Sequence, residues 1–149
     1  MEKLRKANAV WQGGLEDGKG WVSSESGVLS DTPYNFAKRF GEEAGTNPEE
    51  LVAAAHAACF AMASSAELGK VGITPEKIEA GCTIKFEMVE GAPTITLAKL
   101  TATVVVPAGS DEAKARQAVE AAKAGCPISR LLNAPMELEL NIVQSGAAG

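Results

Sequence analysis

Three cysteines and one histidine carry the most reactive side chains of this chain. Cys59 lies in an alanine-rich run, Cys126 directly precedes a proline, and Cys82 lies between a glycine and a threonine. A thiolate attacks electrophilic oxygen, sulfur or carbonyl carbon, so these residues point to redox or acyl-transfer chemistry. No C-x-x-C pair occurs, and a single histidine does not suit a structural zinc site. We therefore expect neither a metal nor a cofactor.

Cys126 has the setting most typical of a reactive thiol. The run Gly125-Cys126-Pro127 predicts that one helix ends and another begins, with Cys126 at the N-cap of the second. The unpaired backbone N–H groups and the macrodipole at a helix start favour a thiolate. Cys82, in contrast, has no acid, base or turn near it in the sequence, so we expect it to be a packing residue in a strand.

His56 precedes Cys59 by three positions, which places both residues on one face of a helix. A Cys–His dyad in an acyl transferase or hydrolase is therefore one alternative. No oxyanion loop is evident, however, and a lone histidine on an apolar helix is more often a hydrogen-bonded core residue. Cys59 itself could equally be a small buried residue, so the helix alone leaves its role open.

The elements around these residues predict one α+β domain over residues 1–149, with mostly antiparallel sheets packed on a long central helix. A proline at the first helical position and two acids in the first turn begin that helix, and Gly69 and Gly72 are expected to end it. Its middle is apolar nearly all round, which predicts a buried position. The periodicity of apolar residues and the positions of turn residues predict the order of the elements. Short strands over 7–40 come first, and this helix follows over 51–68; then come strands over 77–89 and 93–106, a helix over 113–124 and a strand over 136–143.

The charge and hydropathy patterns exclude several classes of partner. The formal net charge is -5, and no basic run of five or more residues occurs, which argues against nucleic acid. No apolar segment follows the charged residues 1–6, and no stretch is expected to reach the length of a membrane span. We therefore expect a cytoplasmic protein with no membrane partner, in a compartment that keeps thiols reduced.

Two long motifs around the cysteines, together with N-terminal residues, closely resemble the OsmC/Ohr family of thiol peroxidases, in particular its OsmC branch. The resemblance covers essentially the whole chain. Its motifs are Thr46-Asn47-Pro48-Glu49-Glu50-Leu51, His56-Ala57-Ala58-Cys59-Phe60 and Ala124-Gly125-Cys126-Pro127-Ile128-Ser129, with Trp11, Gly18-Lys19-Gly20, Ser24-Glu25-Ser26-Gly27-Val28-Leu29 and Arg39-Phe40 upstream.

The resemblance implies a two-cysteine peroxidase that protects against oxidative stress. Cys59 matches the cysteine that attacks the peroxide, and Cys126 matches the cysteine that then forms a disulfide with it. Arg39 and Glu49 match the arginine and glutamate of the family's site. The family forms an intertwined homodimer, prefers organic hydroperoxides to hydrogen peroxide, and is typically recycled by dihydrolipoyl thiols.

The physical chemistry adds two requirements to this mechanism. Burial in an apolar helix opposes ionisation of Cys59, so a cation must lie close to it, and Arg39 is the nearest candidate in sequence. Glu49 lies ten positions before Cys59, about 15 Å along a continuous helix, which is too far for direct contact. Either Arg39 bridges part of this gap or a second chain contributes, so we predict an obligate dimer with shared active sites. A Cys59–Cys126 disulfide further requires Cα atoms within about 7 Å.

Bulky apolar residues close to the motifs in sequence could line a cleft that favours alkyl hydroperoxides. A non-enzymatic alternative is a redox-sensing or small-ligand-binding dimer that uses the same disulfide as a switch. The candidate lining residues are Phe36, Phe40, Phe60, Met62, Leu131 and Leu132.

Overall fold

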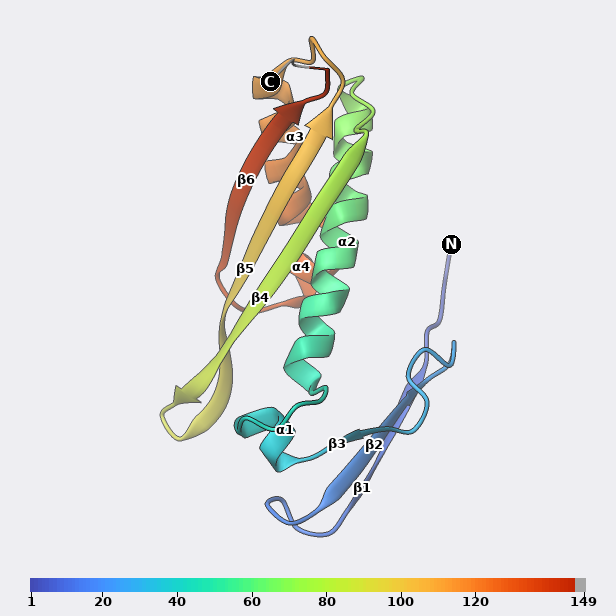
Figure 1. Ribbon diagram of the computed structural model, residues 1–149, viewed down its shortest axis with the longest axis vertical. Helices are drawn as coiled ribbons and strands as arrows, with labels where there is room; N and C mark the ends of the chain where they lie inside the picture. The colour runs from blue at the N-terminus through green and yellow to red at the C-terminus, as the bar shows by residue number, and fades with distance from the viewer. Residues whose placement is uncertain (147–149) are drawn as a thin grey trace. The chain divides into compact units, whose positions relative to one another are not determined.

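The computed structural model describes residues 1–146, and the chain divides into two compact units, Met1–Leu51 and Val52–Gly149. Figure 1 labels the helices and strands of both units. Each unit is described by itself below. The expectation of one domain over residues 1–149 stays a prediction.

The first unit contains a small antiparallel sheet in the order β1-β2-β3. Its strands are β1 (Ala7–Gln12), β2 (Lys19–Ser24) and β3 (Thr32–Tyr34), as the turn residues between them predict. The short helix α1 (Phe36–Phe40) follows. Its N-cap is Asn35, whose side-chain oxygen accepts a hydrogen bond from the backbone N–H of Lys38 at 2.8 Å. This cap fixes where the helical turn that carries the candidate arginine begins.

Helix α2 (Pro48–Lys70) is the longest element. Its start follows the predicted pattern, because the side chain of Asn47 accepts a hydrogen bond from the backbone N–H of Glu50 at 2.9 Å. Its end differs from the prediction, since the helix continues through Gly69 and stops before Gly72. That glycine has φ of +78°, a left-handed conformation that favours glycine and ends a helix.

The second unit contains a sheet in the order β4-β5-β6. Strands β4 (Lys77–Val89) and β5 (Ala92–Val106) form an antiparallel hairpin. Its two turn residues, Glu90 and Gly91, have φ of +50° and +81°, as a tight hairpin turn requires. Strand β6 (Met136–Gln144) pairs with β5 in parallel, because the intervening helices return the chain to the same end of the sheet. The other strand pairs are antiparallel, so the prediction of mostly antiparallel sheets is confirmed.

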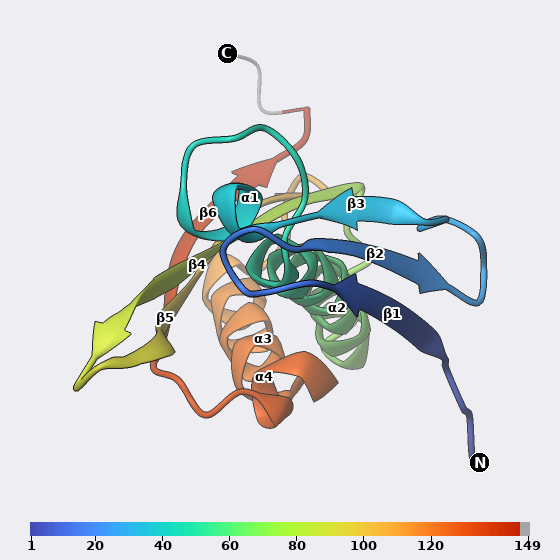
Figure 2. The same cartoon turned by 90° about the horizontal axis from the view of Figure 1, so that it is seen from below.

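Helices α2 and α3 (Glu112–Gly125) cover one face of this second sheet (Figure 1 and Figure 2). Every second residue of β5 from Ala98 onward is buried against them, which is the period of a strand with one face in the core. The two units contain helices and mostly antiparallel strands, so the predicted α+β class is confirmed. The buried core residues are Phe60, Leu68, Ile73, Leu100, Ala102, Val104, Val106, Ala115, Ala118, Val119 and Ala122.

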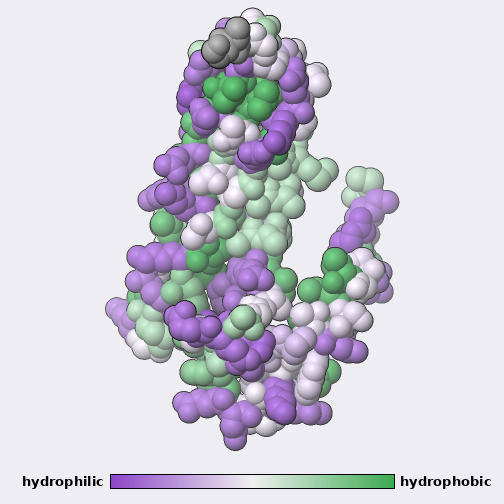
Figure 3. Space-filling view, in the orientation of Figure 1, coloured by the Kyte–Doolittle hydropathy of each residue, from purple (hydrophilic) through white to green (hydrophobic). Residues whose placement is uncertain are grey.

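The single chain buries only one side of α2, so the expectation of burial all round is not met within it. The buried side chains recur every four residues, which is the spacing of one helix face: His56, Phe60, Ser64 and Leu68. On the opposite side, Ala54 and Ala58 are exposed, and Met62 is 77% exposed. Figure 3 shows apolar residues along this helix. The apolar pattern of α2 therefore includes a face that is exposed among the residues that the structure describes.

By length and composition alone, α2 could cross a membrane. It has 23 residues, and the mean hydropathy of its apolar window is 1.4. The expectation that no stretch reaches the length of a membrane span was therefore wrong. One such helix is weak evidence for a span, because a core helix of a globular protein has the same properties. Here α2 contributes Phe60 and Leu68 to the core.

Candidate active site

Cys59 lies in the middle of α2 and is half-buried. Burial raises the pKa of its thiol, and the neighbouring Cys126 side chain raises it further. A hydrogen bond from the backbone of Ile128 acts in the opposite direction and lowers the pKa. The net effect is a raised pKa, so Cys59 needs an additional positive charge to react as a thiolate at neutral pH.

Cys126 lies at the junction of two helices, as the sequence predicts. It is the C-cap of α3 and the N-cap of α4 (Pro127–Leu131), with Pro127 at the first helical position. Its sulfur accepts a hydrogen bond from the backbone N–H of Ser129 at 3.3 Å. Only 1% of Cys126 is exposed. The helix junction therefore holds this sulfur in one position.

The structure brings Cys59 and Cys126 together although 67 positions (126 minus 59) separate them in the sequence. The side chain of Cys126 lies close enough to Cys59 to raise the pKa of its thiol, and both thiols are free. The turn that carries Cys126 also presents the backbone of Ile128 to Cys59. Two neighbouring thiols can form a disulfide where the geometry of their Cα atoms allows it.

Arg39 and Glu49 form an ion pair in the first unit. The guanidinium donates to the carboxylate three times, from Nε at 3.2 Å to each oxygen and from Nη2 at 2.8 Å to Oε1. The Glu49 side chain is 12% exposed and that of Arg39 is 35% exposed. The hydrogen bond with Glu49 raises the pKa of Arg39, so the arginine carries its charge at any physiological pH. The pair fixes the plane of the guanidinium.

An apolar hollow of about 260 Å³ adjoins this arginine in the first unit. Aromatic rings form much of its wall, and the rings of Phe36 and Phe40 lie 4.7 Å apart between centroids with their planes tilted by 39°. Of the other bulky residues expected to line a cleft, Phe60 is fully buried in the core and Leu131 is 75% exposed. The hollow is lined by Trp11, Leu15, Tyr34, Asn35, Phe36, Arg39 and Phe40.

His56 takes part in contacts that sequence reasoning missed. Its Nε2 lies 2.8 Å from Oγ of Ser129, and its Nδ1 lies 3.6 Å from Sγ of Cys82. Both ring nitrogens are therefore engaged by residues other than Cys59, which disfavours a Cys59–His56 dyad. Cys82 has no base near it in the sequence, but it packs against the core and there meets the ring of His56. Cys82 follows the apolar alternation of β4, so its side chain faces the helices, and the sequence contained this signal.

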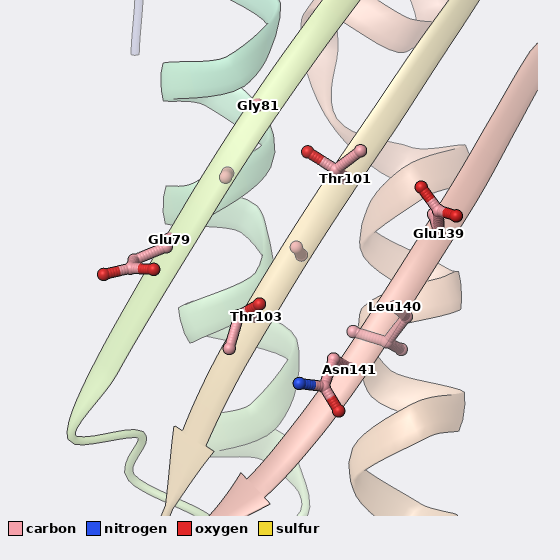
Figure 4. A pocket seen from close by; sticks show the side chains of 9 residues that line it. Glu79, Gly81, Thr101, Thr103, Glu139, Leu140 and Asn141 are labelled. Atoms are coloured by element: carbon pink, nitrogen blue, oxygen red, sulfur yellow. The ribbon is translucent and has the colours of Figure 1, made fainter.

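A hollow of about 480 Å³ on the second sheet is lined by none of the cysteines. Figure 4 shows the side chains of Glu79, Thr101 and Glu139 on the sheet face that is turned away from α2 and α3. The thiols lie on the helix side of the sheet, so this hollow is not their site. Within residues 1–146, no group of three or more His, Cys, Asp or Glu side chains could hold a metal ion.

The model of the family described as "OsmC-like protein" matches residues 41–141, a segment that includes both Cys59 and Cys126. The chain belongs to the OsmC-like family. Peroxiredoxin OsmC of Escherichia coli is 45% identical over 138 residues, which are 93% of this chain and 96% of that protein. OhrB of Bacillus subtilis, an organic hydroperoxide resistance protein, is 33% identical over 127 residues, 83% and 88% of the two chains.

Solved structures of the OsmC-like family have the same fold. The crystal structure of Bacillus subtilis OhrB matches with a TM-score of 0.67 at 27% identity, covering 92% of this chain and 97% of that one. An organic hydroperoxide resistance protein from Elizabethkingia anophelis matches with a TM-score of 0.71 at 25% identity, covering 97% and 100%. The OsmC-like resemblance that the cysteine motifs carry is thereby confirmed.

Proposed function

We propose that this protein is a thiol peroxidase that reduces organic hydroperoxides, and hydrogen peroxide less well, by means of Cys59 and Cys126. The observation that carries the proposal is the proximity of these two thiols, one half-buried on α2 and one at the start of α4. Relatives named peroxiredoxin and organic hydroperoxide resistance protein support the same chemistry.

The cycle has three steps. The Cys59 thiolate attacks the terminal peroxide oxygen, the O–O bond breaks, and an alcohol leaves while Cys59 becomes a sulfenic acid. Cys126 then attacks the sulfenic sulfur, the S–S bond forms, and the oxygen leaves as water. An external dithiol reduces the disulfide and restores both thiols. A dihydrolipoyl group fits this role, and the cytoplasm is the location that such a reductant suits.

Arg39 supplies the positive charge that Cys59 needs. A guanidinium beside the sulfur favours the thiolate and then stabilises the alkoxide that develops as the O–O bond breaks. The three hydrogen bonds from Arg39 to Glu49 keep the guanidinium oriented for this role. The apolar hollow next to Arg39 suits the organic part of the substrate, which favours alkyl and aryl hydroperoxides over hydrogen peroxide.

The functional form is a homodimer in which the Arg39–Glu49 pair of one subunit serves Cys59 of the other. The helical rise places Glu49 about 15 Å from Cys59 along α2, so a direct contact within one helix is excluded. The uncovered apolar side of α2, with Met62 at its centre, is the surface that a second copy would cover. Its alanines allow two helices to approach closely.

The test is the consumption of cumene hydroperoxide with dihydrolipoamide as the reductant. We expect Cys59→Ser to lose consumption entirely. We expect Cys126→Ser to consume one equivalent of peroxide per subunit and then stop, because the sulfenic acid forms but is not converted to the disulfide. Undiminished consumption by Cys59→Ser would contradict the proposal.

Two alternatives predict different results with the same proteins. A Cys–His hydrolase would lose activity on an activated ester when His56 is replaced by alanine, and would keep it in Cys126→Ser. A redox-sensing dimer would oxidise once and show no multiple turnover with dihydrolipoamide.

A further inference from the structure

A chain of four side chains joins the strand β4 to Cys126 through the interior of the second unit. Cys82 contacts Nδ1 of His56 at 3.6 Å, Nε2 of His56 contacts Oγ of Ser129 at 2.8 Å, and that oxygen contacts Sγ of Cys126 at 3.2 Å. His56 is 0% exposed, Ser129 is 3% exposed and Cys126 is 1% exposed. The peroxidase cycle described above assigns no role to Cys82, His56 or Ser129.

The arrangement is more specific than core packing requires. Polar side chains are costly to bury unless they are hydrogen-bonded, and apolar residues of similar volume could fill the same space. Three separate elements, α2, β4 and α4, contribute to the chain of contacts. Ser129 meets the sulfur of Cys126 with two groups, its hydroxyl at 3.2 Å and its backbone N–H at 3.3 Å.

The protonation states suit a proton acceptor behind Cys126. Burial lowers the pKa of His56, so its ring is neutral at pH 7 and one nitrogen has a free lone pair. Burial raises the pKa of Cys82, which therefore remains a thiol. When Nδ1–H of His56 donates to the sulfur of Cys82, Nε2 can accept from Ser129, and the hydroxyl of Ser129 can accept from the thiol of Cys126.

We propose that His56 and Ser129 are positioning residues for disulfide formation, in which Ser129 orients Cys126 and passes its proton to His56. The proposal rests on the peroxidase function above and concerns only its second step. The sulfur of Cys126 forms the S–S bond with Cys59 while the S–O bond of the sulfenic acid breaks. The thiol proton moves to the oxygen of Ser129, and the hydroxyl proton of Ser129 moves to Nε2 of His56. The hydroxide that leaves Cys59 takes up the proton that His56 gives back through Ser129 and departs as water, so His56 returns to its neutral form and the step forms one disulfide and one water.

The rate of the second step decides how much Cys59 is lost to further oxidation. A sulfenic acid that persists reacts with a second peroxide and becomes a sulfinic acid, which most thiols do not reduce. The buried contacts of His56 and Ser129 would thereby protect the enzyme at high peroxide concentration, without any contact with the peroxide itself.

The test separates the two steps by time-resolved quenching. The reduced protein is mixed with cumene hydroperoxide, dimedone traps the sulfenic acid, and intact mass distinguishes thiol, dimedone adduct, disulfide and sulfinic acid. Ser129→Ala removes the hydroxyl and keeps the backbone N–H. His56→Gln keeps a hydrogen-bonding group near Ser129 and cannot take up a proton. Ser129→Thr keeps the hydroxyl and is the matched conservative variant.

We expect Ser129→Ala and His56→Gln to form the disulfide about tenfold more slowly, or slower still, with formation of the sulfenic acid unchanged. Both variants should accumulate sulfinic acid at lower peroxide concentration, and Ser129→Thr should recover most of the wild-type rate. A disulfide rate in Ser129→Ala equal to that of wild type overturns the proposal, and so does an equal loss in both steps. An unchanged rate in His56→Gln overturns the role of His56. If wild-type Cys59 forms no sulfenic acid at all, the peroxidase function itself fails, which is a distinct result.

Discussion

Replacement of Glu49 by glutamine tests whether the ion pair positions Arg39 for catalysis. Glutamine has the same length as glutamate and keeps one carbonyl oxygen, but it loses the charge and the second accepting oxygen. The native carboxylate accepts three hydrogen bonds from Arg39, at 2.8 to 3.2 Å. The variant can keep at most part of this arrangement, so the guanidinium gains freedom to leave its position.

The expected loss of activity in Glu49→Gln follows from the exposure of the Arg39 and Glu49 side chains. Hydrogen bonds between charged groups are worth about 1.5–3 kcal/mol when the groups are well buried. Glu49 is 12% exposed, but Arg39 is 35% exposed, so solvent screens part of the interaction. If the substitution removes about 1–2 kcal/mol of the free energy that holds Arg39 in position, kcat/KM should fall about 5- to 30-fold.

The assay is kcat/KM for cumene hydroperoxide with dihydrolipoamide, measured alongside urea unfolding. The matched control is Glu50→Gln, because Glu50 is an exposed neighbour that accepts a hydrogen bond from the hydroxyl of Thr46 at 2.9 Å. We expect the control to stay within about twofold of wild type, as exposed substitutions usually do. A Glu49→Gln enzyme within the same range would refute the reasoning, since Arg39 would then work without its partner.

Three further predictions concern stability and assembly. Burial lowers the pKa of His56 below 6.5, so as the pH falls the unfolded chain protonates this ring before the folded chain does, and the free energy of unfolding decreases below about pH 7. Urea unfolding across that pH range should show a smaller decrease in His56→Gln than in wild type. An equal decrease in the two proteins would contradict this prediction. Leu100 is 0% exposed in the core, so Leu100→Ala should lower the free energy of unfolding by about 2–5 kcal/mol. Chemical denaturation checks this against Leu131→Ala, an exposed control that should change it by less than about 0.5 kcal/mol. Met62→Glu places a charge on the uncovered side of α2, so sedimentation should show monomers with low peroxidase activity, whereas an intact dimer would argue against this interface.

Much of the fold could be predicted from local sequence signals. Pro48 with its preceding asparagine fixes the start of α2, and the strand bounds of β4 and β5 follow from their alternation and turn. The junction at Cys126 is equally local, because a glycine before it and a proline after it leave few alternatives. These features depend on neighbours within a few residues, which is why the sequence alone determines them.

Some residues of the candidate site could likewise be identified from the sequence, and others could not. Cys59 and Cys126 could be identified because long motifs surround both of them, and their roles stay predictions until the cysteine variants are measured. Phe60 lies beside Cys59 in the sequence, yet it belongs to the core rather than to a substrate cleft. The direction of a side chain around a helix depends on what packs there, which adjacency in sequence does not reveal.

Tertiary structure alone decided the environment of His56. Its two ring nitrogens meet Ser129 from α4 and Cys82 from β4, residues 73 and 26 positions away. The sequence determined that a lone histidine would lie on an apolar helix, but a hydrogen bond needs two groups within about 3 Å, and only the packing of three elements sets that distance. The same packing brings Cys126 to Cys59, and so converts two separate thiols into one candidate redox centre.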